Sequence, residues 1–174
     1  MTAKKLQTIL AAHHRWSGDS TMGQRADLAG ANLVRANLAG ANLAWANLTG
    51  ADLTGATGLF DACDWIAANL KRVRGGVEAY KTFGSQYVAP DEWIIEPGAV
   101  ISENVNPLPT LACACGVNVG TLDWVTRNNQ IGFPIWRLLV KWEWLAGGVI
   151  PYDTTGKFRV PKAQLLGLLE KRAL

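Results

Sequence analysis

The sequence has few charged residues and few cysteines, and it lacks a long apolar run. Of its 174 residues, 18% are charged and three are cysteines. No stretch reaches the roughly 18 apolar residues that a transmembrane helix needs, so no membrane partner is expected. The odd number of cysteines and the apparent lack of a secretion signal favour free thiols. We therefore expect a globular protein of the cytoplasm, or one made in a cytoplasm and assembled there.

The net charge of +3 is small. A nucleic-acid partner usually requires a strong basic stripe, so nucleic acid is not an expected partner. A protein that mimics DNA needs dense carboxylates, and a positive chain does not provide them.

Sequence signatures of common enzymes are also missing. The chain has no G-x-S-x-G elbow, no phosphate-binding P-loop and no G-x-G-x-x-G. A cysteine nucleophile in the C-terminal half has no histidine base nearby in sequence, because the two histidines are His13 and His14. We expect no enzyme activity, no catalytic residues and no cofactor.

The cysteines do not form a good metal motif. Cys113 and Cys115 are spaced as C-x-C, whereas structural zinc sites favour C-x2-C pairs. Further ligands would have to come from Cys63 and from His13 or His14, in the other half of the chain. We therefore predict no metal site and expect buried thiols that pack as small apolar groups.

A five-residue repeat, Ala-(Asn/Asp)-Leu-x-x, occupies residues 26–55. A helix would spread these leucines around its circumference, and a strand would alternate them between faces. A coil with one side per five residues can bury them all, with Asn or Asp stabilising a turn. The expected repeat core consists of Leu28, Leu33, Leu38, Leu43, Leu48 and Leu53.

This spacing strongly resembles the pentapeptide-repeat family, whose fold is a right-handed quadrilateral β-helix. The resemblance covers about residues 24–60, and the register fails at "ATGLF", where Gly58 takes the Leu position. Four units make one turn, so the run makes fewer than two turns and needs caps. We expect a helix in "KKLQTILAAHHRW" to cover one end and a helix in "FDACDWIAANLKRV" to close the other. The N-terminal part is then residues 1–75.

Beyond this part the composition becomes β-rich. The runs "VEAYKTFG", "EWIIEPGAVI", "FPIWRLLVKWEWL", "GGVIPYD" and "KFRVP" are separated by Gly, Pro and Asn. "GTLDWVTRNN" predicts a short helix that starts near Thr121, and "KAQLLGLLEKRAL" predicts a strand that decays into a tail. Residues 76–174 are expected to form a small α+β domain. The fold class of the whole chain is thus α+β, mainly β.

The C-terminal part carries a second resemblance. The stretch from "VEAYKTFGSQYVAPDEWIIEPGAVI" to "GTLDWV", followed by "WEWLAGGVIPYDTTGKFRV", is similar to the C-terminal domain of phage and prophage pentapeptide-repeat proteins. The start, "LQTILAAHHRWSGDSTMGQRADLAGANL", is similar to theirs as well. This resemblance implies a phage or prophage origin, with the protein in the virion or the host cytoplasm.

The segment "YDTTGKFRV" allows two interpretations. In the first, which we favour, it is a hairpin in which Asp153 opens a turn, Gly156 has a positive φ, and Lys157 and Arg159 face solvent. In the second, Lys157 and Arg159 hold an anionic group such as a nucleotide phosphate. The candidate ligand-binding residues are then Tyr80, Lys81, Asn118, Tyr152, Lys157 and Arg159.

The expected function is that of a non-catalytic, phage-encoded protein-binding or structural module. Its partner would be a capsid, tail or host protein, bound by the flat repeat sides or by the Trp-rich C-terminal part; a homo-oligomer is compatible with this. The alternative is a protein that binds or sequesters a small ligand or nucleotide. A DNA-mimic, gyrase-protecting role is disfavoured, because the coil is short and Arg25 and Arg35 offset Asp27 and Asp52.

Overall fold

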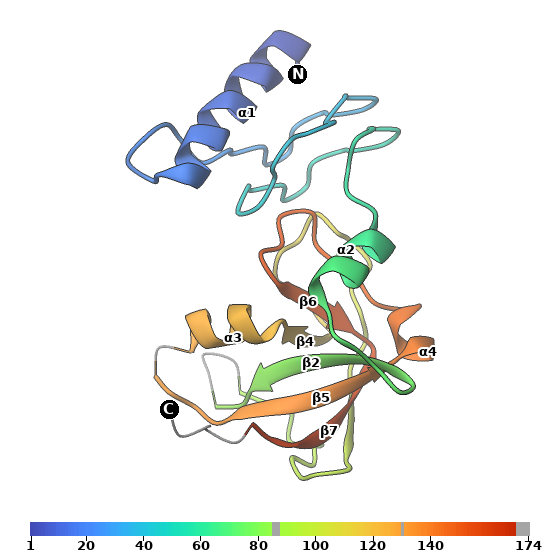
Figure 1. Cartoon of the computed structure of the whole chain (residues 1–174). Coiled ribbons are helices and arrows are strands. Elements are labelled where there is room, and N and C mark those ends of the chain that lie inside the picture. Colours follow the sequence, from blue (N-terminus) through green and yellow to red (C-terminus); the bar gives the residue numbers. More distant parts are fainter. Residues whose placement is uncertain (85–87, 130, 170–174) are drawn as a thin grey trace. The chain divides into compact units, whose positions relative to one another are not determined.

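The computed structural model describes residues 1–84, 88–129 and 131–169 (Figure 1). The helices are α1 (Ala3–Gly18), α2 (Ala62–Asn69), α3 (Leu122–Asn128) and α4 (Trp142–Leu145). The strands are β1 (Arg72–Val73), β2 (Gly76–Thr82), β3 (Val100–Ser102), β4 (Val117–Gly120), β5 (Ile135–Lys141), β6 (Lys157–Val160) and β7 (Lys162–Leu168). The described fold is mainly β, with few helices.

The chain divides into two compact units. Unit 1 comprises Met1–Asp61, Leu108–Cys113 and Pro151–Thr155, and unit 2 comprises the other described residues. This division differs from the expected boundary between residues 75 and 76. The reason is that α2 belongs with the sheet, while two later segments belong with the repeats.

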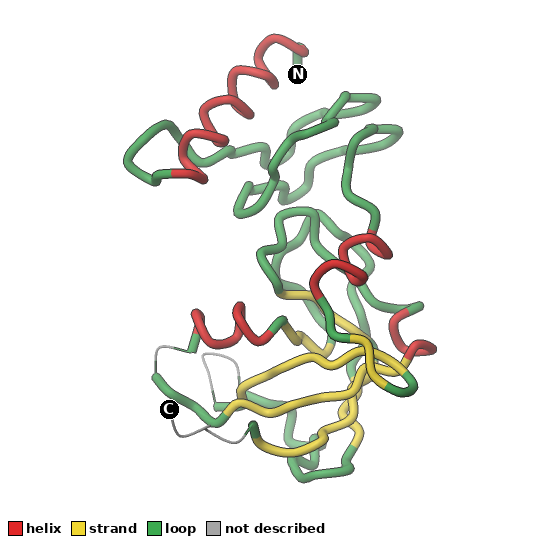
Figure 2. The backbone as a smooth tube through the Cα atoms, viewed as in Figure 1, coloured by secondary structure: helices red, strands yellow, loops and turns green. Residues whose placement is uncertain are grey.

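The repeats of unit 1 form a coil. Parallel backbone bridges join Asp27 to Asn47, Asn32 to Asp52, and Asn37 to Thr57, each pair twenty positions apart. Four five-residue units therefore make one turn. Because each bridge is a single pair, Figure 2 draws the segment between α1 and α2 as a winding loop without strands. The sides are residues 26–30 with 46–50 (first), 31–35 with 51–55 (second), 36–40 with 56–60 (third) and 41–45 alone (fourth).

Each corner of the coil repeats the same turn. In each unit after the first, the N–H of the alanine donates to the carbonyl of the leucine three residues earlier, as from Ala36 to Leu33 at 2.9 Å. The polar residue of each unit accepts from the N–H two residues later, as Asn37 Oδ1 does from Ala39 at 2.9 Å. The prediction that Asn and Asp stabilise the turns is confirmed.

The leucines of the coil form the core of unit 1. Five of the six predicted core leucines are at most 6% exposed, namely Leu28, Leu33, Leu38, Leu43 and Leu48. The sixth, Leu53, is only partly buried, since it lies in the last regular unit of the stack. Among the alanines, Ala26 and Ala46 are fully buried and the rest are partly buried.

Helix α1 covers one end of the coil, as predicted. Leu6 is buried, and Ile9 and Leu10 pack against the leucine core. His13 is fully buried: its Nδ1 accepts from the N–H of Ala26 at 3.1 Å and its Nε2 donates to the carbonyl of Ala44 at 3.0 Å. The imidazole therefore bonds to backbone groups of the first and fourth sides of the coil.

The prediction that the helix after the repeats closes the other end is wrong. Trp65 and Ile66 of α2 pack against the core of unit 2, and the Trp65 ring meets Phe158 edge-on at 5.8 Å. The apolar side chains of α2 therefore pack against the core of unit 2.

Segments Leu108–Cys113 and Pro151–Thr155 join the coil instead. The N–H of Trp45 donates to the carbonyl of Asp153 at 3.0 Å, in the way that coil residues bond to the next turn. Tyr152 packs against the leucine core and meets the Phe60 ring edge-on at 5.7 Å.

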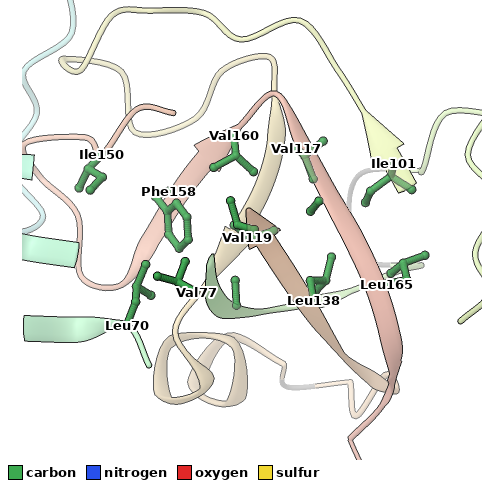
Figure 3. Close-up of a cluster of buried hydrophobic side chains, with 13 residues drawn as sticks. Leu70, Val77, Ile101, Val117, Val119, Leu138, Ile150, Phe158, Val160 and Leu165 are labelled. Carbon is green, nitrogen blue, oxygen red and sulfur yellow. The ribbon is translucent and has the colours of Figure 1, made fainter. Parts of the chain in front are cut away.

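The core element of unit 2 is a curled antiparallel sheet. Among the described residues it has the strand order β3-β7-β5-β2-β4-β6, with β1 added beside β2 (Figure 1). All pairs are antiparallel, and a bulge between Arg137 and Leu138 breaks the register of β5 with β7. The inward side chains form one apolar cluster, which Figure 3 shows gathered from several strands; it includes Val77, Val119, Leu138, Phe158 and Leu165.

The predicted elements of unit 2 are partly confirmed. The strand over "VEAYKTFG", the helix after Thr121, the strand over "KFRVP" and the last strand are present as β2, α3, β6 and β7. The run "FPIWRLLVKWEWL" ends in helix α4, and only the end of "EWIIEPGAVI" lies in a strand. "GGVIPYD" contributes a single bridge, from Val149 to Arg159.

The burial of His13 makes the stability of unit 1 depend on pH. Burial lowers the pKa of His13 below its usual 6.5; the bond to Ala44 opposes this shift and the charge of Arg25 adds to it. The unfolded chain thus takes up a proton near pH 6.5 while the folded chain does not. The stabilisation is present above pH 6.5 and is lost as the pH falls below it.

We expect the free energy of unfolding to drop as the pH falls below 6.5, and the drop to be smaller in His13→Gln. Chemical denaturation at a series of pH values measures it. The exposed neighbour provides the control, because His14→Gln should keep the full drop. An equal drop in wild type and His13→Gln would contradict the assignment.

Candidate functional site

The sheet brings together five of the six predicted ligand-binding residues. Tyr80 pairs with Gly120 across β2 and β4, and Asn118 and Gly120 pair with Arg159 and Lys157 across β4 and β6. Lys81 Nζ donates to the carbonyl of Asn118 at 3.1 Å. Tyr152, the sixth residue, belongs to unit 1.

Two of these residues hold the loop before β4. Arg159 is fully buried, and its Nε donates to the carbonyl of Asn106 at 2.8 Å. The side-chain amide of Asn118 donates to the carbonyls of Ala114 and Gly116, both at 3.0 Å. The expectation that Arg159 faces solvent is therefore wrong, and both side chains serve the fold.

Tyr80 also has a partner within the protein. Its hydroxyl donates to Oε1 of Glu78, which is 7% exposed and lies 3.6 Å from the ammonium of Lys71. Burial, together with this bond and the charge of Glu78, raises the pKa of Tyr80 to about 12. Tyr80 therefore stays protonated at physiological pH, and its hydroxyl already makes a hydrogen bond to Glu78.

Lys81 is the unusual residue of the group. Its ammonium lies 5.4 Å from the Phe83 ring centre and 5.7 Å from that of Trp93. Burial, and to a lesser degree the charge of Lys157, lowers the pKa of Lys81 to about 8. Among the described residues, no carboxylate lies within 4 Å of this ammonium. Lys81 is thus a partly buried cation whose sole bonded acceptor in the described chain is a neutral carbonyl.

Helix α3 positions the second lysine. Lys157 Nζ lies 5.9 Å from the centre of the Trp124 ring. Gly120 and Gly156 allow the close approach of Trp124, since a Cβ at either would lie under 3 Å from this side chain. Thr121 caps the helix by accepting from the N–H of Trp124. Two ammonium groups of like charge, Lys81 and Lys157, therefore share one region of unit 2.

Unit 1 carries a groove that sequence reasoning missed. It has a volume of about 350 Å³ and is lined by residues 40–43, residues 58–60 and Tyr152. Its walls include Leu43, Leu59, Phe60 and Tyr152, and no lining residue is charged. The break of register at "ATGLF" was the one sequence signal for it, because there the coil stops supplying a regular side.

The cysteines differ from expectation in their exposure. The side chains of Cys63, Cys113 and Cys115 are exposed, and the expectation that they are buried apolar groups is wrong. Within the described ranges, no group of three or more His, Cys, Asp or Glu side chains is arranged to hold a metal ion.

No helix of the described chain combines the length and apolar character that crossing a bilayer requires.

The lowered pKa of Lys81 leads to a second prediction. The unfolded chain binds this proton up to about pH 10.5 and the folded chain only up to about pH 8, so wild-type stability should rise between these values. Lys81→Met lacks the titrating group and should lose this rise, which in full amounts to about 3 kcal/mol.

Unfolding experiments between pH 7.5 and about 10.5 check this. The exposed Lys162 provides the matched control, because Lys162→Met should rise like wild type. Lys157→Met should raise the pKa of Lys81 and so reduce the rise. A parallel pH profile for wild type and Lys81→Met would refute the assignment.

Comparison with known proteins identifies a family for the repeats of the coil only. No curated protein and no solved structure gives a significant match to the chain. Residues 24–57 match the family model described as Pentapeptide repeats, in 8 copies. The match covers the coil and not unit 2. The chain therefore carries pentapeptide repeats, as the five-residue spacing predicted.

Proposed function

We propose that this protein is a non-catalytic, phage-encoded protein-binding module whose partner docks on the coil of unit 1. We further infer that the coil is a short right-handed quadrilateral β-helix. The repeat match and the twenty-residue bridge interval support this fold. The phage origin rests on the resemblance of residues 6–33 and of the C-terminal part to phage and prophage pentapeptide-repeat proteins.

Trp45 is the observation that carries the proposal. It is the fifth residue of its unit and has a φ of 70°. Four other units place glycine at this position, also with positive φ, namely Gly30, Gly40, Gly50 and Gly55. A side chain in this conformation costs about 1 kcal/mol or more relative to glycine.

The Trp45 ring is not needed to fill the core. Trp45 is 45% exposed, so much of its surface faces solvent. Tryptophan is among the residues that contribute most to protein–protein binding energy. An exposed tryptophan at a position suited to glycine is therefore best explained as an anchor for a partner. Arg35, with a φ of 56°, shares this backbone conformation on the second side.

The partner is proposed to be a capsid, tail or host protein, which places this protein in the virion or the host cytoplasm. A DNA-mimic role is disfavoured, since the coil makes fewer than two turns. Its outward charges also offset each other, with Arg25 and Arg35 against Asp27 and Asp52.

A second candidate function is binding of a small anion, such as the phosphate of a nucleotide. Lys81 favours it, because an anion would relieve the repulsion between this partly buried ammonium and Lys157. Inorganic phosphate should then raise the melting temperature, and Lys81→Met should abolish the shift while Lys162→Met keeps it. Equal shifts in all three proteins would refute this site.

The strain at Trp45 yields a test of stability. We expect Trp45→Gly to be more stable than Trp45→Ala by about 1 kcal/mol, because glycine relieves the positive φ and alanine does not. Val34, which lacks a positive φ, is the control: there the alanine variant should be the more stable of the two. Chemical denaturation of the four variants measures both differences, and Trp45→Ala equal to or above Trp45→Gly would contradict the prediction.

The function itself is tested by finding the partner. A photoreactive amino acid at position 45 should cross-link one protein in phage-producing cells, and mass spectrometry of purified virions shows whether both are packaged. With the partner purified, Trp45→Gly and Trp45→Ala should each weaken binding at least about tenfold, and Val34→Ala should change it little. Unchanged affinity in both Trp45 variants would overturn the proposal.

A further inference from the structure

The fourth side of the coil lacks the backbone pairing that its other sides have. On the first three sides, the leucine N–H of the first turn donates to the carbonyl of the residue opposite. These bonds run from Leu28 to Asn47, Leu33 to Asp52 and Leu38 to Thr57, all at 2.8 Å.

A return bond completes each pair. The N–H of the residue opposite donates back to the alanine carbonyl of the first turn. These bonds run from Asn47 to Ala26, Asp52 to Ala31 and Thr57 to Ala36, at 2.9 to 3.0 Å.

On the fourth side the equivalent groups are the N–H of Leu43 and the carbonyl of Ala41. Neither has a hydrogen-bond partner among the described residues. The chain leaves the coil after Phe60, before it could supply the unit opposite. The third bond of a regular side is still made, from the N–H of Trp45 to the carbonyl of Asp153 at 3.0 Å. One backbone donor and one acceptor thus remain open at β-bridge spacing.

The uncharged groove lies at these two groups. Ala41, Asn42 and Leu43 form one wall, and the rings of Phe60 and Tyr152 form another, around about 350 Å³. Loop Pro151–Thr155 is bonded to Trp45 on one flank and Tyr152 meets Phe60 on the other. The space is therefore bounded by Phe60 at the end of the coil and by Tyr152 of the loop Pro151–Thr155.

We propose that an extended, uncharged segment of a partner protein binds in this groove and supplies the missing unit of the fourth side. One of its residues accepts from the Leu43 N–H and donates to the Ala41 carbonyl, as the bridge residues of the other sides do. A following apolar side chain packs against Phe60 and Tyr152. The inference rests on the proposed function and names the chemistry of the partner segment.

The open N–H of Leu43 and carbonyl of Ala41 favour a peptide over a small molecule as the occupant of the groove. The open donor and acceptor are two residues apart on one strand edge, which is the pattern a single extended residue satisfies. Uncharged chemistry follows from the lining, where a buried charge would lack a partner.

The probe is a labelled synthetic peptide of two Ala-Asn-Leu-Thr-Gly units, the sequence of residues 46–50. Fluorescence anisotropy measures binding up to about 1 mM peptide. NMR-detected hydrogen exchange measures protection of the Leu43 amide. We expect saturating peptide to slow this exchange at least about tenfold. A peptide N-methylated at both asparagines cannot donate to Ala41 and should bind at least about tenfold more weakly.

Two matched variants separate the groove from the rest of the coil. Gly40 and Gly30 occupy the same position of their units, both have positive φ, and neither has an atom within 4 Å of an added Cβ. Arg35 shows that the coil accommodates arginine there. Gly40→Arg places a long charged side chain at the groove and should weaken peptide binding at least about tenfold; Gly30→Arg should leave it within about twofold. Melting temperatures of both variants verify that they fold alike.

Three results would overturn the inference: no peptide binding, an unprotected Leu43 amide in the complex, or equal binding by the two arginine variants. Dimerisation of the free protein that Gly40→Arg abolishes would also overturn it, because the occupant would be a second copy. The isolated partner distinguishes the two proposals. If it depends on Trp45 but binds Gly40→Arg like wild type, the groove assignment fails and the protein-binding function stands.

Discussion

A coil of fewer than two turns leaves apolar leucines and unpaired backbone groups at both of its ends, and the architecture of unit 1 depends on covering them. In a long repeat array only the first and last turns are uncovered, whereas in this short coil almost every unit lies at an end. At one end the imidazole of His13 bonds to Ala26 and Ala44. At the other, Leu108–Cys113 and Pro151–Thr155, which follow unit 2 segments in sequence, join the coil. The repeats therefore fold as part of a larger arrangement.

Coverage is incomplete on the fourth side, and the two features relevant to binding converge there. Trp45 accepts a backbone conformation better suited to glycine, yet exposes much of its ring. The open backbone pair and the groove belong to the same five-residue unit. One segment, residues 41–45, thus combines an aromatic anchor with unfilled hydrogen-bonding groups, which is the combination that strand addition to a partner requires.

Unit 2 uses three of its predicted ligand-binding residues for its own structure. Arg159 and Asn118 hold loop carbonyls, and Tyr80 is engaged by Glu78. These side chains looked like ligand-binding groups in the sequence because residue type alone does not reveal what already occupies a donor. Lys81 is different, since burial and Lys157 both disfavour its charged form. Among the described residues, the Lys81 ammonium is stabilised by one backbone carbonyl and by two aromatic rings.

The sequence by itself determined the coil: a period of five excludes helix and strand, and the positions of Leu, Ala and Asn specify core, corner and turn. It also determined most strands and helix α3 of unit 2, because their alternation and capping residues are local signals. The cap at the second end of the coil, the burial of Arg159 and the pairing partner of Trp45 were decided only by the tertiary structure. The helix after the repeats was expected to cap the coil, but its Trp65 packs against Phe158 instead. Periodicity shows which face of a segment is apolar. The residues that cover this face are distant in sequence, so no local pattern predicts which surface the segment packs against.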